Sequence, residues 1–383
     1  MMTSRLLCFR CRFIHVGAIL PASLAALAAC SEAPPVDPPL TEHALNAVTA
    51  DAGAPRNQLA RQIDDLFTKP EFGETRALVV MHAGEIAAER YAPGYDRDTR
   101  FVSWSMAKTV TAVMIGMLVS DGLLRLDESV PEPRWNRPGD ARAEITLRQL
   151  LQMRSGLRHT EAGPVPYNSS EVRMLFMDGR DDMADWATAE TLEAEPGAQF
   201  EYSSNTTVIL ADIAARVLTD STDPDTRRKV VDDYLRTRLF APLGMNSMVP
   251  EYDANGTLIG GSLMHANARD WARFGEFLRH KGSYRGSQII PRNWIEFMVQ
   301  PSPQSEFYGA QTWLNRASGI DRDESRADRG PDTMFAAVGH MGQYVLVSPD
   351  QKLTVVRLGH TNGEERPGMV QQLLDIVELY PGR

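Results

Sequence analysis

The feature that most constrains the fold is a long apolar run at residues 103 to 120. Ser103 or Ser105 opens this run, and an Asp-Gly pair ends it, which is typical of a single helix. One face of that helix carries Met106, Val110, Val113, Met114, Met117 and Leu118. The other faces offer little that is polar, and a helix that is apolar nearly all round has to be buried. We therefore expect this segment to lie inside a globular domain.

The same segment begins with Ser105-Met-Ala-Lys108. The chain has 22 serines but only five lysines, so a Ser-x-x-Lys pattern is expected about 0.3 times by chance. Side chains three apart share a helix face, and the first turn of a helix favours developing negative charge. Burial would favour the neutral amine of the lysine, which could then activate the serine. Taken alone, the pair is equally compatible with a helix-capping serine and a lysine that reaches solvent.

Length and charge narrow the function classes. The 383 residues are 43% hydrophobic, enough for one large domain or two closely packed ones. The net charge is −10 and there is no basic block, so a nucleic-acid partner is not expected.

Residues 1 to 29 are predicted to be a lipoprotein signal peptide. Three arginines at the start precede a mostly apolar stretch, and Leu-Ala-Ala-Cys30 ends it. This tetrapeptide resembles the lipobox of bacterial lipoproteins, in which the cysteine carries the lipid. Ser31 after it resembles an outer-membrane sorting signal, so we expect a lipid-anchored protein facing the periplasm. A plain signal peptide or an uncleaved signal anchor remains the alternative.

Cysteine usage fits an exported protein that folds without disulfides. Cys8 and Cys11 match C-x-x-C, but both fall within the predicted signal peptide, so no redox or metal site follows. The predicted mature chain keeps only Cys30. Residues 30 to 55 are rich in proline and alanine without a hydrophobic period, and we predict a tether there.

The two ends of the body predict strands and helices. Residues 57 to 68 have the spacing of a helix, and residues 76 to 81 and 85 to 91 that of a hairpin. A second hairpin is predicted at 344 to 347 and 353 to 358, and a final helix at 368 to 380.

The middle of the chain contains two further candidate residues. Tyr202 lies between a Pro-Gly turn and a helix predicted from about residue 206, where a tyrosine is more often a packing residue than a functional one. His340 is followed by Met-Gly at a predicted strand edge, and an isolated histidine is usually structural. Glycines beside it are typical of a place where a ligand or another backbone approaches closely.

Taken in order, Ser105-x-x-Lys108, Tyr202-Ser-Ser204 and His340-Met-Gly342 resemble the three motifs of the penicillin-recognising serine hydrolases. The resemblance is to the class C β-lactamase branch, with its family VIII esterases, D-amino-acid peptidases and 6-aminohexanoate-dimer hydrolases. It covers about residues 56 to 380.

This resemblance implies an α+β fold in residues 56 to 383. An antiparallel sheet flanked by helices would come from about 56 to 140 and 260 to 383, and a mostly helical insertion from about 141 to 259.

The resemblance also implies site roles. Ser105 would attack a carbonyl carbon, and Lys108 and Tyr202 would move the proton. Backbone N–H groups of Ser105 and Gln343 would form the oxyanion hole, with His340, Gly342 and Ser204 at the substrate. No cofactor or metal is implied.

Two departures from the family pattern bear on the substrate. The third motif starts with His340 where β-lactamases and cell-wall peptidases have lysine, and histidine is a weaker, pH-dependent cation. Ser204 stands where β-lactamases often have asparagine, which here comes one residue later. Both differences favour the esterase and short-amide branch.

The sequence therefore predicts a serine hydrolase that cleaves small esters or amides through an acyl-enzyme. A weak β-lactamase or DD-peptidase is one alternative, and a non-catalytic envelope binding protein is another. The substrate would depend on loops at residues 161 to 182 and 301 to 332, whose shape the sequence does not determine. The oligomeric state also stays open.

Overall fold

The structure is a computed structural model that describes residues 38–316 and 329–382. The predicted signal peptide, Cys30 and the first part of the predicted tether lie outside the described residues, as does part of the 301 to 332 loop.

One part of the fold is built on a six-stranded antiparallel sheet, in the order β2-β1-β11-β10-β9-β8. Its strands are β1 Glu74–His82, β2 Glu85–Tyr91, β8 Trp313–Leu314, β9 Phe335–Gly339, β10 Gln343–Ser348 and β11 Leu353–His360. Both predicted hairpins are confirmed, as β1–β2 and β10–β11. The first and last parts of the chain meet at the centre of the sheet, where β1 pairs with β11.

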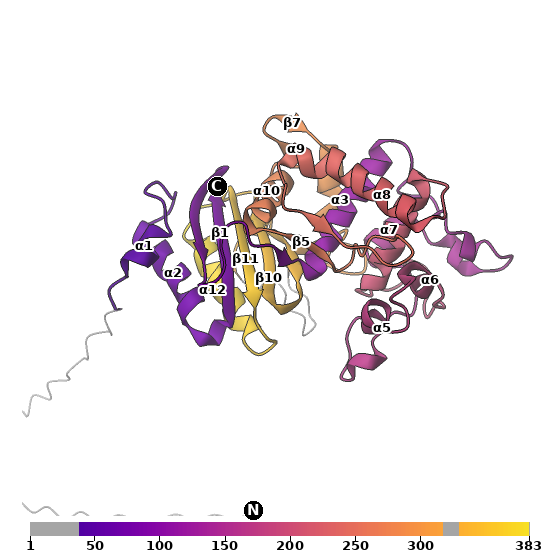
Figure 1. Ribbon diagram of the computed structural model, residues 1–383, viewed down its shortest axis with the longest axis horizontal. Helices are drawn as coiled ribbons and strands as arrows, with labels where there is room; N and C mark the ends of the chain where they lie inside the picture. Colours follow the sequence, from indigo (N-terminus) through magenta and orange to yellow (C-terminus); the bar gives the residue numbers. More distant parts are fainter. Residues whose placement is uncertain (1–37, 317–328, 383) are drawn as a thin grey trace, which may run out of the picture. The chain divides into compact units, whose positions relative to one another are not determined.

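Helices cover both faces of this sheet (Figure 1). On one face lie α2 (Arg56–Thr68) and α12 (Arg366–Glu378), and on the other lies α10 (Ala268–Arg279). Because successive side chains of a strand point to opposite faces, neighbouring residues such as Val355 and Val356 belong to different hydrophobic clusters. The continuous apolar runs of the central strands follow from this two-sided burial.

The remaining helices form a mostly helical region beside α10, within the predicted insertion except for α3 and α11. They are α3 Ala107–Ser120, α4 Leu147–Leu151, α5 Ser170–Phe176, α6 Met183–Thr188, α7 Ser204–Leu218, α8 Pro224–Leu235, α9 Ala241–Leu243 and α11 Arg292–Met298. Two small sheets accompany these helices. The first has three strands, β3 Phe101–Val102, β4 Val249–Pro250 and β5 Met264–Ala266. The second has two, β6 Ser283–Tyr284 and β7 Ser287–Gln288.

Helix α3 is the buried central helix that the sequence predicts. All of its residues from Ala107 to Leu118 are buried. Trp294 of α11 packs directly over Gly116, where a Cβ would lie 2.2 Å from the indole Nε1. The indole donates a hydrogen bond of 3.1 Å to the carbonyl oxygen of Ala112. The helix is therefore fixed along its length, and its first turn faces the sheet.

The second half of the predicted tether is folded. Helix α1 (Glu42–Asn46) is capped by the hydroxyl of Thr41, and Val48 forms a β-bridge with Ala88 of β2. The Arg56 guanidinium donates to the carbonyl oxygens of Leu45 and Val48. The apolar residues of this segment are too sparse to form a hydrophobic period, which is why the sequence pattern did not reveal that it folds.

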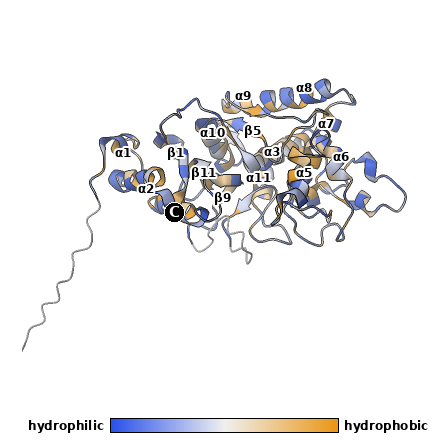
Figure 2. Cartoon of the chain, turned by 60° about the horizontal axis from the view of Figure 1, so that its bottom comes forward, coloured by the Kyte–Doolittle hydropathy of each residue, from blue (hydrophilic) through white to orange (hydrophobic). Residues whose placement is uncertain are grey.

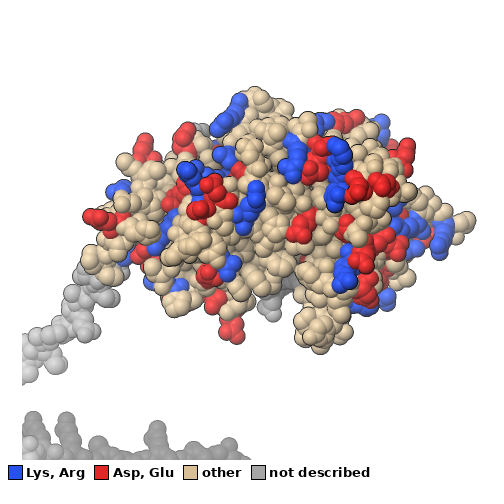
Figure 3. Space-filling model, in the orientation of Figure 1, with Lys and Arg blue, Asp and Glu red and all other residues tan. Residues whose placement is uncertain are grey.

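Charged residues of both signs alternate over the face drawn in Figure 3, without a continuous basic patch. In the described part of the chain, no helix is both long and apolar enough to cross a membrane.

Candidate active site

Ser105 lies in a 3-10 turn, Trp104–Met106, that leads directly into α3. Trp104 has φ +46°, a left-handed conformation that is uncommon for a bulky residue. Strand β9 passes close to this turn because Gly339 has no side chain. A Cβ at Gly339 would lie 2.2 Å from the carbonyl oxygen of Ser103. The serine is thus held on a strained turn between α3 and β9, and it stays partly exposed to the cavity described below.

Lys108 is one helical turn further on and only 1% exposed. Its Nζ lies 2.9 Å from Ser105 Oγ, 2.7 Å from Ser204 Oγ and 2.8 Å from the carbonyl oxygen of Gly261. The structure therefore places the lysine in direct hydrogen-bond contact with the candidate nucleophile, and it does not reach solvent.

Tyr202 immediately precedes Ser203, whose hydroxyl caps α7. The centre of the tyrosine ring is 4.8 Å from Lys108 Nζ. Trp313 and Tyr308 pack against the ring, with centroids at 5.2 Å and 5.6 Å. Tyr202 therefore combines a packing position with a place next to the lysine, and it lines the same cavity as Ser105.

Ser204 is completely buried and lies behind the lysine. Its hydroxyl is 2.7 Å from Glu161 Oε1 and 2.9 Å from Glu171 Oε1. Its backbone N–H donates to Glu161 Oε2 at 2.5 Å. Glu161 also lies 3.6 Å from Lys108 Nζ.

Sequence reasoning missed these two glutamates as site residues. They belong to the 161 to 182 loop and to α5, which the sequence marked only as a region that shapes the substrate site. The pKa of Glu171 is raised to about 8, mainly by burial and to a smaller extent by the negative charge of Glu161. No local pattern indicates this, because the partners come together only in the fold.

His340 and Gly342 lie in the turn between β9 and β10, across the cavity from α5. The His340 ring packs edge-on against Trp104, with centroids 5.4 Å apart. The pKa of His340 is lowered, mainly because the ring is partly buried and to a smaller extent because His360 is nearby. It is therefore neutral at neutral pH.

Gly342 is the last residue of this turn, and Gln343 begins β10 directly after it. Gly342 has φ +79°, and its carbonyl oxygen accepts from the buried guanidinium of Arg357 at 2.9 Å. The Gln343 side chain donates to the carbonyl oxygens of His340, Met341 and Gly359. These bonds fix the turn that carries His340.

These residues surround a cavity of about 710 Å³. Its polar lining includes Ser105, Glu161, Glu171, Tyr202, His340 and Arg366. Its apolar lining includes Trp104, Pro166, Val172, Leu175, Phe176, Trp313 and Val338. The structure thus brings Ser105, Tyr202 and His340 to one cavity and places Lys108 and Ser204 directly behind it.

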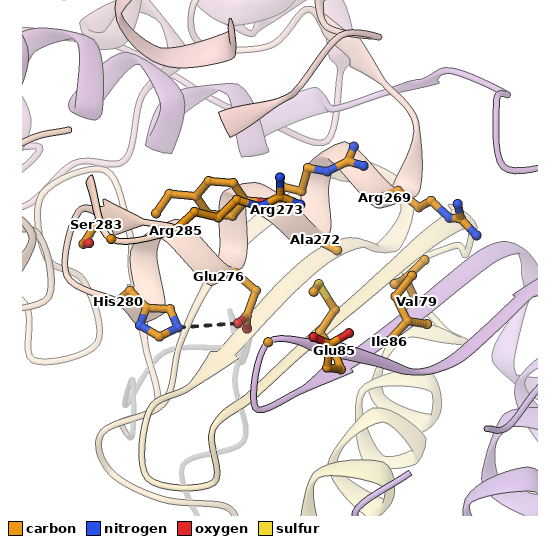
Figure 4. A pocket seen from close by; sticks show the side chains of 14 residues that line it. Val79, Glu85, Ile86, Arg269, Ala272, Arg273, Glu276, His280, Ser283 and Arg285 are labelled. Atoms are coloured by element: carbon orange, nitrogen blue, oxygen red, sulfur yellow. Dashed lines mark ion pairs between the residues drawn. The ribbon is translucent and has the colours of Figure 1, made fainter. Parts of the chain in front are cut away.

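A second cavity, of about 490 Å³, lies between α10 and the β1–β2 hairpin (Figure 4). Arg269, Arg273 and Arg285 line it, but Arg269 is paired with Glu89 and Arg273 with Asp270. None of the predicted site residues is among its lining residues. Across the described residues, no group of three or more His, Cys, Asp and Glu side chains is arranged to hold a metal ion.

Comparisons with known proteins agree with this arrangement. The family model described as "Beta-lactamase" matches residues 71–378. A 6-aminohexanoate-dimer hydrolase from Paenarthrobacter ureafaciens is 26% identical over 304 residues, which cover 76% of this chain and 69% of the relative.

Solved structures share the fold. A putative 6-aminohexanoate-dimer hydrolase from Bacillus anthracis has a TM-score of 0.65 at 22% identity, covering 82% of this chain and 81% of that one. A family VIII carboxylesterase has a TM-score of 0.61 at 17% identity, and the match covers 86% of this chain and 98% of that one. The expected α+β fold of the β-lactamase and transpeptidase type is confirmed.

The family match spans most of the chain, and it includes all three motifs and the Ser105–Lys108 contact. This chain therefore belongs to the beta-lactamase family and is a serine hydrolase of that family.

Proposed function

We propose that this hydrolase cleaves small esters or amides through an acyl-enzyme on Ser105. The observation that carries the proposal is the 2.9 Å contact between Lys108 Nζ and Ser105 Oγ at the base of the 710 Å³ cavity. A nucleophile within hydrogen-bond reach of its base is the arrangement that covalent catalysis requires.

The reaction would proceed in two steps. Ser105 Oγ attacks the carbonyl carbon while its proton passes to the lysine and tyrosine pair, which then protonates the leaving alcohol or amine. Water next attacks the acyl-enzyme, and the same pair takes its proton and returns one to Ser105. The N–H groups of Ser105 and Gln343 are the proposed oxyanion donors, each of which is worth roughly 3 to 4 kcal/mol in such sites.

Two features of the cavity favour neutral substrates with an apolar part. His340 has a lowered pKa and so provides no fixed positive charge for a carboxylate at neutral pH, and the permanent cation of the lining, Arg366, donates to the hydroxyl of Tyr344. Val172, Leu175 and Phe176 of α5 line the cavity with apolar side chains, and Phe176 is also exposed. Figure 2 shows hydrophobic residues of α5 in orange. The names of the relatives, an amide hydrolase and a carboxylesterase, point in the same direction.

Activity profiling tests this proposal. The purified body of the protein should hydrolyse nitrophenyl esters or short amides faster than nitrocefin, and a fluorophosphonate probe should label it. In Ser105→Ala, we expect hydrolysis at least about 1,000-fold lower and no labelling. Nitrocefin turnover at rates similar to ester turnover would favour the β-lactamase alternative. Equal labelling of wild type and Ser105→Ala would contradict the acyl-enzyme.

The cellular location is part of the proposal. The basic start, the apolar stretch and the Leu-Ala-Ala-Cys30 ending support a lipid anchor on Cys30 at the outer membrane, with the domain facing the periplasm. Metabolic labelling with palmitate tests it, since the label should appear in wild type and be lost in Cys30→Ala. Labelling that persists in Cys30→Ala would contradict the anchor.

A further inference from the structure

The two glutamates behind Lys108 are joined by one hydroxyl group. Ser204 Oγ lies 2.7 Å from Glu161 Oε1 and 2.9 Å from Glu171 Oε1, and Lys108 Nζ approaches the same oxygen at 2.7 Å. A serine hydroxyl has a single hydrogen to donate. If both carboxyl groups were ionised, one of the two oxygen–oxygen contacts would contain no hydrogen. One proton on the glutamate pair removes this conflict.

The surroundings indicate which glutamate holds that proton. Glu161 accepts the backbone N–H of Ser204 and lies 3.6 Å from Lys108 Nζ, so its two oxygens face nitrogen donors. Glu171 is raised to a pKa of about 8 by burial and by the charge of Glu161. The pair therefore carries one negative charge at neutral pH, which matches the single positive charge of a protonated lysine.

We infer that Glu161 and Glu171 hold one proton between them and exchange protons with Lys108 through the hydroxyl group that bridges them. The two glutamates are then positioning residues, since they act on the substrate only through the lysine. This inference rests on the proposed acyl-enzyme function.

The exchange balances without any other reactant. The Lys108 ammonium gives a proton to Ser204 Oγ, while the hydroxyl proton of Ser204 moves to the Glu161 carboxylate. The lysine is now a neutral amine that can accept the proton of the attacking nucleophile. Once the lysine has passed that proton to the leaving group, the reverse transfer restores its ammonium and the starting state, so the lysine can be reset without contact with bulk water, in keeping with its 1% exposure.

The groups around Glu171 allow its titration to be identified. His159, next to α7, is buried with a lowered pKa and stays neutral, and burial keeps the pKa of Tyr308 well above its usual value. Within α5, Arg173 is paired with Asp178. Lys108 and Tyr202 face the pair from α3 and the start of α7, and His340, across the cavity, has a lowered pKa. Because Lys108 and Tyr202 are also ionisable, a change in activity near pH 8 is assigned to the glutamate pair only if it is lost in Glu171→Gln.

The pH dependence of kcat/KM tests the inference. Above the pKa of about 8, the pair becomes doubly negative, which holds Lys108 as an ammonium and disfavours an oxyanion at Ser105. Wild-type kcat/KM for a nitrophenyl ester should therefore fall by about tenfold between pH 8 and pH 9.5. Glu171→Gln, a neutral isostere of the protonated side chain, removes the group that titrates, so its kcat/KM should show no such fall between pH 8 and pH 9.5, whatever its absolute value. A fall that persists in Glu171→Gln overturns the inference.

A second variant and a control separate proton exchange from structural damage. Ser204→Ala removes the bridge, so kcat should fall roughly 10- to 100-fold with little change in KM. Wild-type kcat in Ser204→Ala would overturn the inference. The exposed Glu195, replaced by glutamine, serves as the matched control and should keep the wild-type profile.

An infrared titration tests the shared proton without using activity. The carbonyl band of a protonated carboxylic acid should disappear near pH 8 in wild type and be absent near pH 7 in Glu171→Gln. A wild-type protein without such a band at pH 7 overturns the inference. If the band is present but no substrate is hydrolysed and no probe binds, the proposed function fails while the shared proton stands.

Discussion

The two sides of the active-site cavity are built differently. On the lysine side, formed by α3, the start of α7 and the two glutamates, Ser105, Lys108, Ser204, Glu161 and Glu171 are joined by direct contacts, and Lys108 and Ser204 are fully enclosed. On the turn side, between β9 and β10, His340 is exposed and contacts mainly the Trp104 ring. Under the proposed function, proton transfer belongs to the enclosed lysine side, and contact with the outer part of the substrate belongs to the exposed turn side.

The strongest test of this contrast is Lys108→Met. Because the lysine is both the proposed base and the counter-charge of the glutamate pair, we expect kcat/KM to fall at least about 1,000-fold. The fold should also lose roughly 3 to 5 kcal/mol of stability, since a buried carboxylate is left unpaired. Ester hydrolysis and urea unfolding measure the two effects. Unchanged stability would show that the charge of Lys108 does not stabilise the glutamate pair.

Tyr202→Phe should separate chemistry from packing on the same side. The ring contacts with Trp313 and Tyr308 remain, so stability should change by less than about 1 kcal/mol. Loss of the hydroxyl should lower kcat roughly 100- to 1,000-fold with a smaller change in KM. Steady-state kinetics and thermal melts check this. A rise in KM with unchanged kcat would assign the tyrosine to substrate binding instead.

Gly339→Ala tests how the two sides are joined. The new Cβ would lie 2.2 Å from the backbone oxygen of Ser103, so the Ser105 turn or strand β9 must shift. We expect a stability loss of about 1 to 3 kcal/mol and an activity loss of roughly 10- to 100-fold. Gly382→Ala is the matched control, because its added Cβ would meet nothing within 4 Å and Gly382 does not line the cavity. Wild-type activity in Gly339→Ala would show that the close approach of β9 is not needed.

The smallest effect is expected at the exposed residue of the turn side. His340→Lys places a permanent positive charge there, and it should raise kcat/KM for an anionic ester roughly 3- to 10-fold relative to a neutral one. In wild type, His340 becomes positively charged only when the pH falls below the usual pKa range of histidine, because its pKa is lowered. The preference for the anionic ester should therefore appear only at that low pH. Paired kinetics with the two esters from pH 5 to 8 measure it. If the ratio of kcat/KM for the anionic ester to that for the neutral ester does not change, the charged group of the substrate does not lie near residue 340.

Much of the fold was predictable because it depends on local patterns. Both hairpins, α2, α3 and α12 follow from hydrophobic period and turn residues. The pattern failed at residues 40 to 55, where a few apolar residues pack against β2 and α2 without any period.

The candidate site was predictable only in part. Ser105 and Lys108 are three residues apart, so the sequence places them on one helix face, and the structure decides that the lysine contacts the serine instead of reaching solvent. Glu161 and Glu171 lie far along the chain, and nothing in their neighbourhood indicates that they reach Lys108. Ser204 was expected at the substrate, and the structure shows it buried behind the lysine, between the two glutamates.

The sequence by itself determined the family, the order of its three motifs and the pairing of serine with lysine, because these depend on residue type and short spacing. Only the tertiary structure decided how the lysine is surrounded. Burial and the distance between charges set the state of an ionisable group, and both arise from segments that meet only when the chain is folded. The shared proton of Glu161 and Glu171 is therefore a property of the fold.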